Sequence, residues 1–106
     1  LLDALAKLAT SHPSLRLAIV GDGSAREAIA QRAHQLGLTH AVRFAGAVYG
    51  EAELARWFAA SDLFVFPSYL GLSVYHAMNH ALPVVAGDDW RAHGPEFEAV
   101  VHDRTG

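Results

Sequence analysis

Two short segments combine glycines with a serine, a composition suited to holding an anionic ligand against the main chain. The first is Gly21-Asp22-Gly23-Ser24, and the second is Gly71-Leu72-Ser73. Glycine lets a chain turn sharply and lets a ligand approach the backbone closely, and amides at a helix start point toward negative charge. Each segment therefore predicts a cradle for a phosphate group. An ordinary turn from a strand into a helix has the same composition and remains the alternative.

The first segment is not one of the familiar nucleotide-binding motifs. Arg26 stands where Gly-x-Gly-x-x-Gly requires its third glycine, and no Gly-Lys-Ser/Thr follows, so we expect neither a nicotinamide site nor an ATP-binding P-loop. Ser24 and Glu27 have the Ser-x-x-Glu spacing of a capping box. That spacing predicts a helix that starts at Ala25 with Ser24 as its cap. The core face of this helix would consist of Ala28, Ile29, Ala33 and Leu36.

The second segment belongs to a longer loop, residues 67–73, which follows an apolar run and precedes a helical pattern. Ser68 and Ser73 add hydroxyl donors to this loop. We expect backbone amides and the dipole of the following helix to hold a diphosphate here without a lysine. The alternative is a loop that only packs.

Histidine is frequent enough to raise the question of a metal. His76 and His80 lie four residues apart, a spacing that can chelate zinc from one helix face. No third ligand is fixed by the sequence and the chain has no cysteine, so we expect no metal site. Arg91 and His93 lie in a later loop and are either solvated residues or partners for a phosphate group.

The elements that position these residues follow from the hydrophobic pattern. We expect helices at 1–9, 25–36, 51–60, 73–80 and 95–98, and strands at 15–20, 42–44, 63–66, 83–86 and 99–101. Continuous apolar strands between amphipathic helices predict an α/β fold, a parallel sheet with helices on both faces. In such folds ligands bind beyond the carboxyl ends of the strands. The candidate loops are therefore expected at one edge of the sheet.

Composition narrows the class of protein. The chain has 106 residues, which fits one domain, and its 52% hydrophobic and 18% charged residues exclude a disordered segment. The net charge of −3 argues against a nucleic acid partner. The absence of cysteine favours a reducing compartment, and no apolar run reaches the roughly 20 residues of a transmembrane helix. We expect a cytoplasmic protein.

Several stretches resemble sequence blocks of glycosyltransferase family 4. They are residues 17–23, 60–68, 71–78, 82–85, 94–98 and 105–106, in the family's order and at its spacing. The resemblance implies that residues 1–106 are a single, truncated, Rossmann-like domain that binds a nucleotide-sugar, the C-terminal half of a GT-B enzyme. Such enzymes transfer a sugar to an acceptor, usually with retention and without an essential metal or other cofactor.

The same resemblance implies partners and a location for the whole protein. The acceptor domain, N-terminal to this one, would lie outside the chain. So would the family's Arg/Lys pair, which neutralises the departing diphosphate, and no residue of the chain is therefore expected to be catalytic on its own. The full-length protein would be cytoplasmic, or peripheral at the inner face of the membrane.

Residue by residue, the resemblance implies one set of contacts to the donor. The expected substrate-binding residues are Gly21, Gly23, Ser24, Ser68, Gly71, Leu72, Ser73, His76, Glu96 and Glu98. Ser68 and His76 stand where the family has two glutamates, eight positions apart. An imidazole can still hydrogen-bond a ribose hydroxyl, whereas the serine reaches a sugar hydroxyl only weakly. Glu96 and Glu98 are either a ribose clamp or polar helix ends.

The loss of both glutamates supports a second interpretation. A catalytically degenerate nucleotide-binding domain, or a structural or interaction module, would carry the same substitutions. An upstream Arg/Lys pair and a second α/β domain in the full-length protein would favour the enzyme.

Overall fold

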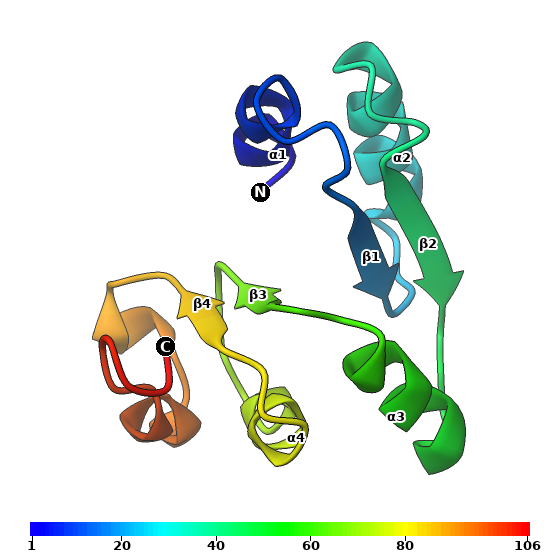
Figure 1. Ribbon diagram of the computed structural model, residues 1–106. Helices are drawn as coiled ribbons and strands as arrows, with labels where there is room; N and C mark the ends of the chain where they lie inside the picture. The colour runs from blue at the N-terminus through cyan, green and yellow to red at the C-terminus, as the bar shows by residue number, and fades with distance from the viewer. The chain divides into compact units, whose positions relative to one another are not determined.

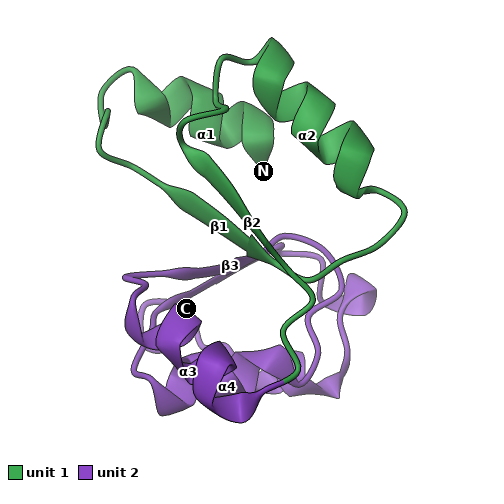
Figure 2. Cartoon of the chain, turned by 90° about the vertical axis from the view of Figure 1, so that its right-hand side faces the viewer, with its two compact units in different colours: residues 1–49 green, residues 50–106 purple.

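The computed structural model describes all residues from 1 to 106, and they divide into two compact units. Residues 1–49 form unit 1 and residues 50–106 form unit 2, coloured green and purple in Figure 2. Each unit is an α/β arrangement around one two-stranded parallel sheet. The expected α/β fold with parallel strands is therefore confirmed.

Unit 1 alternates helices and strands (Figure 1). Its elements are α1 (Leu2–Ala9), β1 (Leu17–Val20), α2 (Arg26–Gln35) and β2 (Val42–Gly46). Strands β1 and β2 run parallel, with Leu17 opposite Val42 and Ile19 opposite Phe44. Parallel neighbours need a crossover connection, which α2 supplies, so the turn from β1 into α2 lies at the carboxyl end of β1.

The core of unit 1 joins its two helices to the start of its strands. Leu5, Ala33, Leu38 and Ala41 are buried, and Leu17 packs against them. Leu5 and Ala33 come from the apolar faces of α1 and α2. Packing in this unit therefore concentrates at the amino ends of the strands and leaves the turn at the carboxyl end of β1 exposed.

Unit 2 repeats the alternation and ends in two short 3₁₀ turns. Its elements are α3 (Glu51–Ala59), β3 (Phe64–Phe66), α4 (Ser73–Asn79), β4 (Val84–Ala86), η1 (Trp90–Ala92) and η2 (Pro95–Ala99). Strands β3 and β4 are parallel, with Phe64 opposite Val84. The buried core consists of Leu70, Val74, Ala77, Leu82 and Val84, with Phe58, Phe64, Phe66 and Met78 packed against it.

Three local expectations are wrong. No strand forms at 99–101, because the Thr105 hydroxyl accepts from the amide of Val101 and donates to the carbonyl of Ala99, which closes this segment into a turn. Ser24 does not cap α2. The helix starts at Arg26, with Ala25 already in helical conformation and no side-chain cap bond. Ala28, expected on the core face of α2, is exposed.

No helix of the structure has the length and apolar character needed to span a bilayer.

Candidate functional site

The turn from β1 into α2 is shaped by backbone that only glycine adopts easily. Gly21 has φ +133° and donates to the carbonyl of Gly46, itself at φ +74°, at 2.8 Å. L-residues with side chains rarely occupy such conformations. Gly23 has no such constraint, and a Cβ built there would meet no atom within 4 Å. Gly21 is thus required by the fold, whereas Gly23 borders open space.

A hollow of about 210 Å³ lies at this turn. Its lining includes Ile19, Gly21, Gly23, Arg26, Ile29 and Phe44. The Arg26 guanidinium lies 5.9 Å from the centre of the Phe44 ring, and the Asp22 carboxylate also lines the hollow, so it has an apolar wall and one edge that carries both a positive and a negative charge. Its volume is below the roughly 300–1,000 Å³ of small-molecule sites. The hollow is large enough for one part of a nucleotide. Ser24 is exposed beside it.

A larger hollow of about 310 Å³ lies on α3 and is lined by Glu53, Arg56 and Trp57. None of these residues is a candidate from the sequence. It is therefore a weaker candidate for a ligand site than the turn from β1 into α2.

The loop from β3 into α4 offers backbone donors. The amides of Val74 and Tyr75 are satisfied by the carbonyls of Gly71 and Leu72, whereas the amides of Gly71, Leu72 and Ser73 have no partner in the structure. Helix α4 has only seven residues and no side-chain cap. The capacity of this loop to bind an anion therefore rests on three consecutive unpaired amides rather than on a long helix dipole.

The same loop is anchored at Leu70, the residue before the unpaired amides. Its side chain is fully buried. Its amide donates to Nδ1 of His93 at 3.0 Å, and its carbonyl accepts from the amide of Gly94 at 3.0 Å. This role of His93 could not be predicted from the sequence, because its partners lie 23 and 6 residues away along the chain. It is neither a solvated residue nor free to face a departing phosphate.

The two residues expected at the positions of the family's glutamates are both exposed. Ser68 lies in the loop, and His76 lies in α4. The His76 ring stacks on Phe58 with centroids 5.9 Å apart, and His80 stacks on Phe58 at 5.5 Å. No group of three or more metal-ligating side chains gathers in the structure. His76 therefore has one face on an aromatic ring, and its polar edge lies at the surface.

The structure separates the two acidic candidates of η2. A Cβ built at Gly94 would lie 2.5 Å from a carboxylate oxygen of Glu96 and 3.1 Å from the carbonyl of Leu70. Glu96 is half-buried at the anchor of the loop, whereas Glu98 is exposed. Arg91 is exposed, with its guanidinium 4.7 Å from the centre of the Trp90 ring. Glu96 is the better placed of the two carboxylates to act beside the loop.

Comparison with known proteins decides the family. The model of the glycosyl transferases group 1 family matches residues 1–106. The chain belongs to the glycosyl transferases group 1 family. It is 40% identical over 98 residues to a D-inositol 3-phosphate glycosyltransferase of Streptomyces griseus, with 81% of this chain and 21% of that protein covered.

Two further comparisons agree with that assignment. The chain is 36% identical over 88 residues to the sulfoquinovosyl transferase SQD2 of Arabidopsis thaliana, covering 80% of this chain and 16% of that protein. A crystal structure of Anabaena Alr3699/HepE in complex with UDP superposes with a TM-score of 0.74 at 30% identity, covering 96% of this chain and 28% of the other. The chain thus spans about a fifth of the length of the first relatives.

Proposed function

We propose that this chain is the donor-binding part of a glycosyltransferase that moves a sugar from a nucleotide-sugar to an acceptor. The observation that carries the proposal is the run of three unpaired amides at Gly71, Leu72 and Ser73. The solved relative with 30% identity is in complex with UDP, which supports a nucleoside diphosphate as the group held. The N-terminal acceptor domain and a retaining outcome are parts of this proposal.

The chemistry explains why these amides matter. In glycosyl transfer the bond from the anomeric carbon to the diphosphate oxygen breaks, and a new bond forms to an acceptor oxygen that gives up its proton. Negative charge grows on the departing diphosphate. Fixed donors aimed at growing charge lower the barrier. Backbone amides are such donors, and they need neither a metal nor a lysine side chain to act in this way. The Gly21–Ser24 turn is a second candidate contact with the donor.

The roles of the individual candidates follow from exposure and reach. We assign Ser68 and Ser73 as hydroxyl partners of the sugar and diphosphate, and His76 as the partner of a ribose hydroxyl. Glu96 is the preferred carboxylate for a hydroxyl of the donor, since it lies beside the anchor of the loop, and Glu98 is the weaker candidate.

The experiment is a calorimetric titration of the full-length protein with UDP, GDP and ADP, followed by their sugar conjugates. The proposal expects saturable binding of one nucleoside diphosphate. A release assay, which measures free diphosphate formed from the sugar conjugate, is expected to show slow cleavage of the bond between the sugar and the diphosphate. The absence of binding by all three at millimolar concentration would contradict it.

A degenerate nucleotide-binding module is the second candidate, favoured by Ser68 and His76 in place of two glutamates. It expects binding of the nucleotide-sugar without release of the diphosphate under any acceptor condition. The release assay therefore separates an enzyme from a binding module once binding is established.

A further inference from the structure

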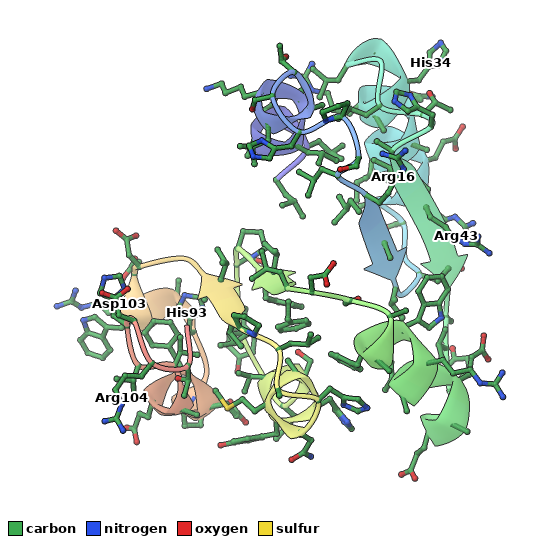
Figure 3. The ribbon with its side chains drawn as sticks, in the orientation of Figure 1. Arg16, His34, Arg43, His93, Asp103 and Arg104 are labelled. Carbon is green, nitrogen blue, oxygen red and sulfur yellow. The ribbon has the colours of Figure 1, made fainter.

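His93 connects the loop after β3 with the loop after β4; Figure 3 labels it. Its Nδ1 accepts a hydrogen bond from the amide of Leu70 at 3.0 Å, and its Nε2 lies 2.8 Å from the carbonyl oxygen of Gly87. A carbonyl only accepts, so Nε2 carries the proton, and Nδ1 must be bare to accept from an amide. Both contacts together select the neutral imidazole with its proton on Nε2.

The plane of the His93 ring is fixed as well. It stacks on Phe97 of η2 with ring centroids 4.3 Å apart and an interplanar angle of 5°. Stacking of this kind favours one ring orientation, and the two hydrogen bonds select which nitrogen faces Leu70. The titratable neighbours on the elements around it are Tyr69 and Glu96, whose polar atoms lie near Gly94, and Arg91 and Asp89 of the same loop. None of them has a hydrogen bond to the His93 ring.

His93 acts on the three unpaired amides through Leu70. Its amide is held by His93, its carbonyl by Gly94 and its side chain by the core. The peptide bond that follows Leu70 carries the amide of Gly71, the first of the three. The orientation of these donors is therefore set by protein contacts before any ligand arrives. Pre-organised donors bind more tightly, because the ligand does not have to order the loop.

We propose that His93, as a neutral imidazole, is a positioning residue for the donor: it holds Leu70 so that the amides of Gly71, Leu72 and Ser73 face the diphosphate. This inference rests on the proposed function. His93 does not touch the ligand itself, since both of its ring nitrogens are used within the chain. Its effect is therefore expected through the orientation of these amides, on donor binding and on the stabilisation of the departing diphosphate.

Three variants of the full-length protein isolate the hydrogen bonds. His93→Phe keeps a ring to stack on Phe97 and loses both bonds. His93→Gln places an amide oxygen and an amide nitrogen at a similar separation, and can restore an acceptor for Leu70 and a donor for Gly87. His80→Phe is the matched control, because His80 also stacks on a phenylalanine and makes one bond to a backbone carbonyl.

The measurements are the Kd of the nucleoside diphosphate that the wild type binds, and KM and kcat for its sugar conjugate. We expect His93→Phe to raise Kd and KM by about tenfold, the equivalent of one lost buried hydrogen bond, and to lower kcat at least about threefold, because the same amides stabilise the departing diphosphate. We expect His93→Gln to lie within about threefold of the wild type and His80→Phe to match it.

Unchanged Kd and KM in a folded His93→Phe variant would overturn the inference, and so would a loss in His93→Gln as large as in His93→Phe. If the Phe variant does not fold, His93→Ala decides, because water can enter the vacated space and satisfy both backbone groups. It is expected to show the same rise in Kd, and a wild-type Kd would overturn the inference. Failure of the wild type to bind any nucleoside diphosphate contradicts the proposed function instead.

Discussion

The carboxylate of Asp22 accepts a hydrogen bond from the amide of Gly23 at 2.8 Å. The Gly23 amide, which the glycine-rich pattern predicts to face an anionic ligand, thus already donates to a carboxylate of the protein itself. The second carboxylate oxygen lies 3.6 Å from the Arg26 guanidinium, and both side chains are about half exposed. An anion at this turn meets a neighbouring negative charge that is only partly offset by the arginine.

Removing that charge should strengthen nucleotide binding. Asp22→Asn keeps an oxygen for the amide of Gly23 and deletes the negative charge. We expect the nucleoside diphosphate to bind about two- to fivefold tighter in low salt, with a smaller gain at high salt, because exposed charges are screened. Calorimetry at two ionic strengths measures this.

The control for that variant is Asp3→Asn, which breaks a comparably exposed ion pair with Arg32 between α1 and α2. It should leave nucleotide affinity unchanged. Equal effects of the two substitutions would show that general charge, and not the turn, governs binding.

The two glycines of the turn should separate folding from binding. Gly23→Ala places a methyl in open space, so we expect stability within about 0.5 kcal/mol of the wild type and donor affinity reduced at least about threefold, because the methyl fills part of the hollow. Gly21→Ala, at φ +133°, should lower stability by about 1–2 kcal/mol. Urea denaturation and calorimetry on each variant test the pair. Full donor affinity in Gly23→Ala would remove this turn from the donor site.

His76 and His80 form a matched pair for the ribose contact. Both stack on Phe58 at similar distances, so either alanine variant loses one ring stack. We expect His76→Ala to weaken nucleoside diphosphate binding by about three- to tenfold, the effect of one lost hydrogen bond, and His80→Ala to leave it unchanged. A comparison of the nucleoside diphosphate with inorganic pyrophosphate adds a check, since pyrophosphate has no ribose. An equal loss for both ligands would argue against the ribose contact.

Leu70 and Leu72 should divide structure from function within one loop. Leu70 is fully buried, whereas Leu72 is 69% exposed. Leu70→Ala should cost about 2–5 kcal/mol of stability through the cavity that it leaves. Leu72→Ala should change stability by less than about 0.5 kcal/mol and weaken binding of the sugar conjugate. Thermal melts and titrations of both variants distinguish these results; a large loss of stability in Leu72→Ala would contradict the assignment.

The sequence was informative where a pattern repeats along the chain. The helical spacing around Leu5 and the apolar run at Leu15–Val20 located α1 and β1 within two residues. Turn-level detail depended on single competing bonds. The Thr105 hydroxyl bonds the backbone of Ala99 and Val101, a segment that has strand composition. Because Ala25 is in helical conformation, Ser24 does not cap α2.

Within the candidate site, the sequence indicated the glycines and the 67–73 loop, but not what holds the loop in place. The anchor joins Leu70 to His93, and nothing in the local pattern around either residue reports a contact across 23 positions. The preference for Glu96 over Glu98 likewise required the structure. In the sequence each glutamate is one residue from an end of η2, and the two differ in their neighbours in space.

Hydrogen–deuterium exchange of the full-length protein, with and without UDP, GDP or ADP, tests the central claim most directly. Amides held by a ligand exchange more slowly than free ones. The account predicts that one of these nucleotides slows exchange in the peptide that covers residues 70–76, because the amides of Gly71, Leu72 and Ser73 then gain partners. Exchange in this peptide that is unchanged by all three nucleotides, at concentrations that saturate binding or reach the millimolar range, would contradict it.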